Sequence, residues 1–484
     1  MAVTDRPGIR PDNPAIPNAQ GPGAQGAGAQ GPRSQGPSAQ EIIAADRVPP
    51  PSTLLIESQL DLGTEDIPVE RYTSRAFHDL EVDRMWRRVW QVAAREDDLP
   101  RVGDTVVYDL ADMSFLLVRS APDTIKAFYN ACLHRGTQLR DRSGYAPELR
   151  CPFHGWTWNL DGSIKSVPCH WDFAHLDQAG FNLPEAKAAT WGGWVFVNPD
   201  PDAISLSDYL GSFPEHFVWD TARRYKSLHV SKLLRVNWKA CLEAFMESYH
   251  VIATHPQILT YLGDANTQYD VFPGTGPGRP GWNRMNTLSG VSSPHLGYTP
   301  SEEDILAAQL ASYGQDPIPV PPGETARRVL AEATRQVYTP KPASIPGDAL
   351  SDSEAIDNIL YYVFPNFQPW GGVSPINYRF RPNGNDPDSC VMDVMFLSDY
   401  PGDDKPESAK VTQLGFDDDW TEVEALGTLA MVFNQDTGNL PRVQRGLHAT
   451  RKRGVSLGRY QESRIRQIHH ELDYWINRPT AEKE

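Results

Sequence analysis

Two short segments, NACLHRGTQLR (residues 130–140) and CPFHGWTW (residues 151–158), carry the strongest signal in this sequence. Each places a cysteine and a histidine close together, and sixteen residues separate the first histidine from the second cysteine. The two pairs are Cys132 with His134 and Cys151 with His154. Two loops that each supply a thiol and an imidazole predict a metal site with four ligands.

Two kinds of metal site use these ligands. A structural zinc site takes the same side chains, although its pairs are more often CxxC and HxxxH. In a Rieske [2Fe–2S] centre two histidines replace two cysteines on one iron, so each loop would give its cysteine to one iron and its histidine to the other. Gly136 and Gly155 follow the histidines, where tight turns need a permissive backbone. The pattern favours the Rieske cluster and leaves zinc as the alternative.

The composition is that of an ordinary globular chain of 484 residues, with 40% hydrophobic and 22% charged residues. This length allows two or three domains and a large buried core. The net charge of −17 argues against nucleic acid as the main partner, because such binding needs clustered basic residues to neutralise phosphates. No apolar run approaches the roughly 20 residues of a membrane span, so no membrane partner is expected.

The five cysteines do not predict a disulfide framework, because their number is odd and they are sparse in a long chain. They are Cys132, Cys151, Cys169, Cys241 and Cys390. Cys169 stands beside His170, but four ligands are already present, so we interpret it as a small core hydrophobe.

The N-terminal residues 1–55 are predicted to form a disordered tail. Residues 11–40 are almost entirely Gly, Ala, Gln, Pro, Ser and Asn, which bury too little area to offset the entropy of ordering. The segment also lacks the apolar core of a secretory signal peptide, so we expect a cytoplasmic protein.

The rest of the chain is predicted to form two domains. Apolar residues at helical spacing predict a helix over residues 76–95, and the runs DTVVYDL, SFLLVRS and IKAFYNAC predict strands. We therefore assign residues 56–200 to a small antiparallel β domain with an N-terminal helix. Residues 201–484 mix helices with long strands and are assigned to an α+β domain, with helices packed over an antiparallel sheet.

Two local features of the second domain carry further expectations. A long helix over residues 420–447 should break at Gly438 or Pro441. Residues 262–286 include a Gly- and Pro-rich stretch, and we expect them to form a loop that acts as a lid.

A second group of metal-binding side chains lies in NWKACLEAFMESYHVIATHP. His250 and His255 are five positions apart, so on a continuous helix they would point about 140° apart. They can converge on one ion if the helix ends or kinks between them, as the nearby Pro256 and the β-branched residues favour. Asp436, far along the chain, is the candidate third ligand. Two imidazoles and one carboxylate are the facial triad of non-heme Fe(II) oxygenases.

Together these stretches resemble the Rieske non-heme iron aromatic-ring-hydroxylating oxygenases, specifically their large (alpha) subunit. The matching segments are NACLHRG, CPFHGWTW, NWKACLEAFMESYHVIATHP and NQDTGNLPRVQRG, and the likeness extends over residues 65–455. It implies an all-β Rieske [2Fe–2S] domain followed by a helix-grip catalytic domain with an antiparallel sheet. By this resemblance the cluster is held by Cys132, His134, Cys151 and His154, and the mononuclear iron by His250, His255 and Asp436.

The resemblance also implies an activity and partners. The chain would be the terminal oxygenase of a multicomponent system that receives electrons, ultimately from NAD(P)H, through a ferredoxin or a flavin reductase. It would use O₂ to dihydroxylate, monohydroxylate or demethylate an aromatic or polycyclic small molecule, as in aromatic hydrocarbon catabolism. Arg135, Arg140, Arg142 and Arg150 surround the cluster loops, and such a basic patch on an acidic protein suits docking of an acidic electron donor.

Glu247 takes the position at which the family has an acidic residue, three before the first iron histidine. In the family this carboxylate bridges the iron histidine and a cluster histidine of the neighbouring subunit, and a shared carboxylate would orient both rings. Glu243 is a weaker candidate for such support. A bridge between chains requires a closed head-to-tail ring, so we expect a homotrimer, with or without a beta subunit.

Two other hypotheses compete with this one. A Rieske electron carrier would not need His250, His255 and Asp436, or a large domain after the cluster. A zinc-bound scaffold would be colourless. For the substrate pocket, Tyr361, Val363, Phe364, Phe367 and Trp370 are candidates for an apolar wall.

Overall fold

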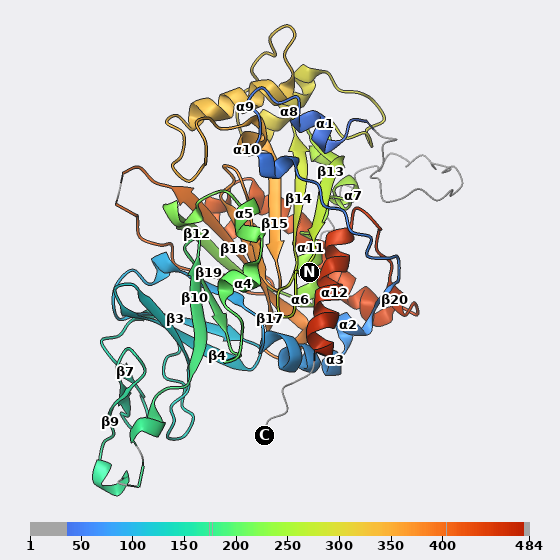
Figure 1. The fold of residues 1–484 in the computed structure, drawn as a ribbon. Helices are drawn as coiled ribbons and strands as arrows, with labels where there is room; N and C mark the ends of the chain where they lie inside the picture. The colour runs from blue at the N-terminus through green and yellow to red at the C-terminus, as the bar shows by residue number, and fades with distance from the viewer. Residues whose placement is uncertain (1–35, 174, 177, 403, 479–484) are drawn as a thin grey trace, which may run out of the picture.

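The computed structural model describes residues 36–478 apart from 174, 177 and 403. Most of the predicted tail, residues 1–35, lies outside the described residues. The chain forms an antiparallel β domain and a larger α+β domain, and an N-terminal segment lies across the second of these (Figure 1). Of the helices that the structure describes, none is both long and apolar enough to cross a membrane.

The N-terminal β domain contains a seven-stranded antiparallel sheet in the order β2-β11-β10-β5-β4-β3-β6. Its strands are β2 (Gln91–Arg95), β3 (Asp104–Leu110), β4 (Met113–Ala121), β5 (Thr124–Tyr129), β6 (Gly144–Tyr145), β10 (Glu185–Trp191) and β11 (Trp194–Asn198). A three-stranded sheet forms the far end of the domain (Figure 1) and comprises β7 (Leu149–Arg150), β8 (Thr157–Trp158) and β9 (Ile164–Ser166). The three runs predicted as strands are β3, β4 and β5.

Strand alternation gives this domain two cores. Phe115 and Leu117 of β4 point into the main core of the molecule, whereas Leu116 points into a separate cluster of buried residues around Phe128 and Trp158. Successive side chains of a strand point to opposite faces, so a single strand can serve both cores. The second core lies under the loops that carry Cys132 and Cys151.

The α+β domain is built on an eight-stranded sheet in the order β13-β14-β15-β16-β17-β18-β12-β19, antiparallel except for the β12/β19 pair. Its strands are β12 (Arg224–Leu234), β13 (Leu262–Phe272), β14 (Trp282–Ser289), β15 (Asn358–Val363), β16 (Phe367–Pro369), β17 (Ile376–Asn383), β18 (Asp386–Asp399) and β19 (Thr412–Leu414). Its helices are α4 (Leu206–Leu210), α5 (Phe213–His216), α6 (Trp238–Glu243), α7 (Val251–Thr254), α8 (Glu302–Ser312), α9 (Ala326–Val337), α10 (Asp352–Ile356), α11 (Leu429–Ala449) and α12 (Ser463–Asn477).

Helix α11 runs through both positions at which a break was predicted, so that prediction is wrong. Pro441 removes one backbone donor, but the helix buries a stripe of side chains on either side of it: Ala430, Phe433, Asp436, Thr437, Leu440 and Gln444. Beyond the proline, Gln444 accepts a hydrogen bond from the backbone N–H of Asn237 at 2.9 Å and donates to the carbonyl of Tyr72 at 3.1 Å. Tertiary packing of this face holds the helix together despite the lost hydrogen bond.

The predicted lid over residues 262–286 is mostly strand. Residues 262–272 form β13 and residues 282–289 form β14, and the two pair as an antiparallel hairpin. Apart from Gly263 of β13, the glycines and prolines lie in residues 273–281, and this connection is the loop between the two strands. The flanking residues include β-branched and aromatic side chains that pack in the sheet.

The N-terminal segment is ordered from residue 36, which differs from the predicted tail of residues 1–55. Helix α1 (Ala39–Ile43) begins with a capping box between Ser38 and Glu41, and Ile43 is fully buried against Leu288 of β14. A further turn at Ser52–Leu55 buries Leu54. The low-complexity composition ends near residue 40, and the apolar side chains that follow supply enough burial to order the chain.

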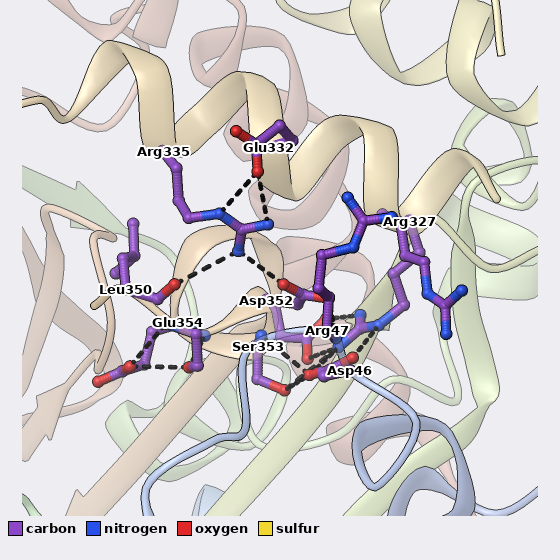
Figure 2. A network of polar contacts seen from close by, with 12 residues as sticks. Asp46, Arg47, Arg327, Glu332, Arg335, Leu350, Asp352, Ser353 and Glu354 are labelled. Carbon is purple, nitrogen blue, oxygen red and sulfur yellow. Dashed lines mark hydrogen bonds and ion pairs between the residues drawn. The ribbon is translucent and has the colours of Figure 1, made fainter. Parts of the chain in front are cut away.

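Buried ion pairs fix this segment to helices α9 and α10 (Figure 2). Asp46 accepts hydrogen bonds from Arg327 at 2.9 Å and from the Ser353 hydroxyl at 2.7 Å, and Arg327 also binds Asp357 at 2.6 Å. Arg335 in turn donates to Asp352 at 2.6 Å. Burial opposes ionisation of Arg327, but Asp357 and Asp46 raise the pKa of its guanidinium. Burial raises the pKa of the Asp46 carboxyl, and the hydrogen bond from Arg327 opposes that shift.

The segment before β2 packs on the α+β domain, which differs from its assignment to the β domain. It comprises β1 (Ile67–Pro68), α2 (Glu70–Thr73), α3 (Arg75–Glu81) and a π-helical turn at Val82–Trp86. Strand β1 pairs with β20 (Gly454–Val455), and the rings of Trp86 and Trp238 meet at 5.1 Å. The predicted helix therefore ends at residue 86, and its last residues form β2 instead.

The two domains share a close interface. The side chain of Asn366 accepts a hydrogen bond from the backbone of Val92 at 3.0 Å, and Phe367 packs edge-on against Trp194 and Phe196. Arg95 is fully buried and donates to the carbonyls of Thr221 and Arg224. Apolar packing and satisfied polar groups therefore hold the β domain against the eight-stranded sheet.

Candidate metal centres

The two Cys/His loops of the β domain are built alike. In the first loop the N–H of Cys132 donates to the carbonyl of Thr137 at 2.8 Å, and in the second Cys151 donates to Trp156 at 2.8 Å. In each loop the glycine four residues after the cysteine donates back to it, and Gly136 and Gly155 both have φ of 75°. The expected left-handed turns are confirmed, and they give each loop the same tight shape.

The four predicted cluster residues come together at the end of these loops. Cys132 and Cys151 are 3% and 2% exposed and their thiols are adjacent, so burial, reinforced by the Cys151 thiol, raises the pKa of Cys132. The rings of His134 and His154 lie 4.6 Å apart. The structure thus places a pair of thiols beside a pair of imidazoles, with one of each from either loop.

These residues fit a [2Fe–2S] cluster. The Nδ1 atom of His134 is buried and has no hydrogen-bond partner among the residues that the structure describes, and its ring is stacked on Trp156. An orphaned imidazole nitrogen beside two thiols is an available metal ligand. The backbone N–H groups of His134 and Arg135 point at the Cys132 sulfur, as is typical of donors that tune a metal-bound thiolate.

Cys169, which we interpreted as a core residue, is exposed instead, with φ of 54°. It lies on the outside of the β domain, just before a short 3₁₀ turn at His170–Phe173. Two large apolar side chains at this end are also exposed, Phe153 at 58% and Trp171 at 79%.

The second group is organised by a single helical turn. Helix α6 ends at Glu243, and α7 spans only Val251–Thr254, with His250 at its start and His255 at its end. Pro256 follows at once, and His255 has the non-helical φ and ψ of −127° and 51°. The helix breaks as the sequence indicated, and this lets two histidines five positions apart face the same point.

Both imidazoles face Asp436 of α11. The Nε2 atom of His255 lies 2.5 Å from Oδ1 of Asp436, and the Nε2 atom of His250 lies 3.5 Å from the same oxygen. One ligand atom from each residue lies within 4.8 Å of the others. Asp436 reaches the site because α11 buries its face between Phe433 and Leu440.

The other nitrogen of each imidazole has its own acceptor. The Nδ1 atom of His250 lies 2.8 Å from Glu247 Oε1, and Glu247 Oε2 accepts from the backbone N–H of His250 at 2.9 Å. The Nδ1 atom of His255 lies 2.9 Å from Oε1 of Gln435. Acceptors on Nδ1 fix both rings with Nε2 directed inward, as is typical of metal-binding histidines.

Gln435 was not predicted from the sequence. Glutamine is common on helix surfaces, and nothing in its type marks it as part of a metal site. The one signal for a role of Gln435 was that it directly precedes Asp436 in the sequence. Adjacent residues at the edge of a buried helix face can contact the same site.

The electrostatic field at this site favours a cation. Burial disfavours charge on His250, but hydrogen bonds to Asp436 and Glu247 raise its pKa to about 10. Burial likewise opposes ionisation of Asp436, yet the two histidines hold its pKa below the usual value. Two carboxylates around two imidazoles attract positive charge, and this donor set fits a divalent metal ion such as Fe(II).

Glu243 does not reach these histidines. It accepts a hydrogen bond from the Tyr72 hydroxyl at 3.0 Å and lies 3.0 Å from Nε2 of His469, within a buried polar group between α2, α6 and α12. Its contacts hold α6 against the N-terminal segment and the last helix.

The residues predicted for the pocket wall do not all lie on one face of the sheet. Tyr361 and Phe367 lie on the sheet face that packs against Phe213. Trp370 lies on the helix-covered face, where its ring meets Tyr378 at 5.9 Å. On this face the ring of Tyr378 contacts four other aromatic rings: Phe245, Trp370, Phe380 and Phe433. Phe433 lies one helical turn before Asp436 in α11, so this aromatic group extends to the triad.

The two predicted metal sites lie in different parts of the fold. The Cys/His loops adjoin β7 and β9 at the lower left end in Figure 1, whereas α7 lies at the upper right. The two sites of one chain are therefore well separated.

Family comparisons agree with this division. Residues 89–177 match the Rieske [2Fe-2S] domain, and residues 219–478 match the catalytic domain of the ring hydroxylating alpha subunit. The second match spans more than half of the chain. The chain belongs to the ring-hydroxylating alpha subunits.

Several relatives of this alpha subunit are oxygenase components. It is 29% identical over 199 residues to the carnitine monooxygenase oxygenase subunit of Escherichia coli K12, covering 39% of this chain and 52% of that protein. It is 30% identical over 214 residues to the alpha subunit of chlorobenzene dioxygenase from a Cupriavidus species, covering 42% of this chain and 48% of that one. These matches therefore span about half the length of the curated relatives.

The fold extends further than the sequence similarity. A solved quaternary ammonium Rieske monooxygenase superposes with a TM-score of 0.61 at 18% identity, covering 87% of this alpha subunit and all of that chain. The predicted fold class, an all-β Rieske domain followed by an α+β catalytic domain with an antiparallel sheet, is confirmed. The two family matches likewise support the predicted cofactors, a Rieske cluster and a mononuclear iron.

Proposed function

We propose that this chain is the terminal oxygenase of a Rieske system that inserts oxygen from O₂ into an aromatic or polycyclic small molecule. The observation that carries this proposal is the presence of two separate donor sets in one chain, Cys₂His₂ in the β domain and His₂Asp in the catalytic domain. When bound, the cluster supplies single electrons and the mononuclear iron supplies O₂ activation. Products of dioxygenation, monooxygenation and demethylation are all compatible with this donor set.

The residues of the chain have distinct roles in this proposal. Cys132, His134, Cys151 and His154 hold the cluster. His250, His255 and Asp436 would hold the iron, which would supply O₂ activation beside the substrate. Glu247 and Gln435 orient the two imidazoles through their Nδ1 atoms. The aromatic side chains around Tyr378 would bind the apolar body of the substrate.

Electron transfer is proposed to run between subunits. The two sites of one chain are far apart (Figure 1), and the solved quaternary ammonium monooxygenase is described in terms of inter-subunit electron transfer. In a head-to-tail homotrimer the Rieske end of one chain would meet α7 of the next, and Glu247 would lie between the histidines of both. The exposed Phe153 and Trp171 provide apolar contact area at that end. A beta subunit could accompany the trimer.

The electron donor is proposed to be a ferredoxin or a flavin reductase supplied by NAD(P)H, and the working compartment to be the cytoplasm, where that reductant is available. Arg135 lies over the Phe153 ring at 4.5 Å, and its guanidinium is 2.8 Å from Nε2 of His154, so a positive charge stands at the exposed edge of the cluster site. An acidic donor protein would be attracted to this edge.

The test is product formation with a ligand variant as its control. Reduced holoenzyme given O₂ and a panel of aromatic substrates should yield hydroxylated products detectable by mass spectrometry. Asp436→Ala should abolish the products and leave the visible spectrum of the cluster unchanged. Continued turnover by Asp436→Ala would show that Asp436 is not the third ligand.

A further inference from the structure

A cleft of about 590 Å³ lies between the two domains, away from both metal sites. Strands β2 and β3 form one wall, and β12, β17 and β18 with the segment at residues 407–413 form the other. This volume is within the range of small-molecule sites, which often lie at domain interfaces. Neither the cluster residues nor the iron triad takes part in its lining.

One buried carboxylate at the floor of the cleft faces two guanidinium groups. Asp393, whose side chain is 1% exposed, lies 2.8 Å from Nε of Arg379 and 3.6 Å from Nε of Arg381. Nε2 of His229 also lies 3.1 Å from Asp393. Burial lowers the pKa of this imidazole, which favours its neutral form. The floor therefore has one more positive than negative group.

Arg381 is the group left without a full partner. Its Nε is buried and has no hydrogen-bond acceptor within the part of the chain that the structure describes, and its single hydrogen bond runs from Nη1 to the carbonyl of Asp109 at 3.2 Å. Arg379, by contrast, is bonded both to Asp393 and to the carbonyl of Ala93. The Arg381 side chain is 18% exposed, and a partly buried guanidinium with donors to spare matches the fork geometry of a carboxylate.

The other charges at the cleft do not supply that partner. These charges are paired with one another or with a neighbour: Lys226 with Asp98, Asp97 with Arg95, Arg101 with Asp104, and Arg142 with Asp141. At the rim, Asp109, Glu407 and Lys410 are exposed, and none of them forms an ion pair with another described residue. These rim acids stand in water, where they are screened, and Lys410 contributes a further positive charge at the entrance.

Apolar side chains line part of the cleft, among polar ones. They include Val92 and Ala94 of β2, Val106 of β3, Met395 of β18 and Val411. A lining of this kind suits a ligand with an apolar body and one acidic group, rather than a bare inorganic anion.

We propose that this cleft binds an organic carboxylate, with the carboxylate on Arg381 and the apolar body between the strands of the two domains. Such a ligand would touch the Rieske domain and the catalytic domain of the same chain and would tie them together. The site is distinct from the oxygenase centre and does not depend on the activity proposed for it.

The test uses full-length holoprotein and 1-naphthoate as the probe, with 1-naphthalenemethanol as the neutral probe of matched size. Isothermal titration should show 1-naphthoate binding, and the neutral alcohol should bind roughly ten-fold more weakly or worse, because it lacks the charge-assisted hydrogen bonds. Arg381→Gln should weaken 1-naphthoate binding by a similar factor, and Arg381→Lys, which keeps the charge, should recover part of it.

Two further variants separate this site from other sources of binding. Arg442→Gln removes one exposed charge elsewhere and should leave 1-naphthoate affinity unchanged. Asp436→Ala should also leave it unchanged, since the cleft does not include the iron triad. Equal affinity for both probes, no binding of 1-naphthoate, or full affinity in a correctly folded Arg381→Gln protein would each overturn the proposal. Loss of binding in Asp436→Ala would also overturn it, because the carboxylate would then belong to the iron site.

Discussion

Replacing Glu247 should weaken the mononuclear iron site more than replacing Gln435. The two side chains perform the same task, because each accepts the Nδ1 hydrogen of one iron-facing histidine, at 2.8 Å for Glu247 and 2.9 Å for Gln435. They differ in charge and in their second hydrogen bond: Glu247 accepts from the backbone N–H of His250 at 2.9 Å, whereas Gln435 accepts from Nε2 of the Gln257 side chain at 2.8 Å. Glu247→Ala and Gln435→Ala therefore form a matched pair.

The size of each effect follows from these contacts. Loss of a charge-assisted hydrogen bond costs about 1.5–3 kcal/mol, and loss of a neutral one costs about 0.5–1.5 kcal/mol. At 1.4 kcal/mol for each factor of ten, Glu247→Ala should lower iron affinity roughly 10- to 100-fold, and Gln435→Ala roughly 2- to 10-fold. Glu247→Gln keeps an acceptor for Nδ1 of His250 but loses the charge. Its loss of iron affinity should therefore fall between those of Gln435→Ala and Glu247→Ala.

The assay is anaerobic titration of protein depleted of mononuclear iron with Fe(II), in competition with a chelator of known affinity. The absorption of the cluster reports that the Rieske domain is intact in each variant. A loss in Gln435→Ala as large as that in Glu247→Ala would refute the reasoning, and so would unchanged affinity in Glu247→Ala.

Three predictions concern stability. Burial raises the pKa of Glu471 from 4.5 to about 7, so the stability linked to its protonated form is fully present below pH 4.5 and is lost as pH rises through 7. Glu471→Gln should therefore be more stable than the parent protein at pH 8, by at most about 3 kcal/mol. Thermal unfolding at pH 4 should show no such gain. Lys239→Met should cost about 3–5 kcal/mol in denaturant unfolding because it leaves Glu81 charged and buried, whereas adding Glu81→Met should recover most of the loss. Asp46→Ala should lower the free energy of unfolding by about 2–4 kcal/mol, because it removes the buried carboxylate that binds Arg327 in the network of Figure 2. Asp61→Ala, which removes an exposed ion pair with Arg459, should have a much smaller effect. Equal losses would contradict the expectation that the buried ion pair contributes more than the exposed one.

The side chains proposed to bind metal could be selected from the sequence because their chemistry is carried by residue type and spacing. Cysteine and histidine pairs at such short spacing rarely occur twice in a chain by chance, and Gly136 and Gly155 marked the turns that shape both loops. His250 and His255 were also recognisable, because Pro256 signalled the helix break that lets them converge. Asp436 was harder to find, since an aspartate on a helix is commonly exposed, and the family resemblance was needed to select it.

Features that depend on tertiary packing could not be predicted. Pro441 weakens an isolated helix, yet α11 continues through it because one face is buried along its whole length. Composition placed the end of the tail at residue 55, but a few apolar residues and the ion pairs of Asp46 order the chain from residue 36. Gln435 acts only through its neighbours, and a local pattern does not reveal such a role.

The central claim is that one chain holds two different iron centres. Iron and acid-labile sulfide should be counted in protein reconstituted under anaerobic conditions, and electron paramagnetic resonance recorded after reduction. The account predicts three irons and two sulfides per chain with a Rieske-type signal, falling to two irons with the same signal in Asp436→Ala. Two irons in the parent protein, or zinc in place of iron and sulfide, would contradict it.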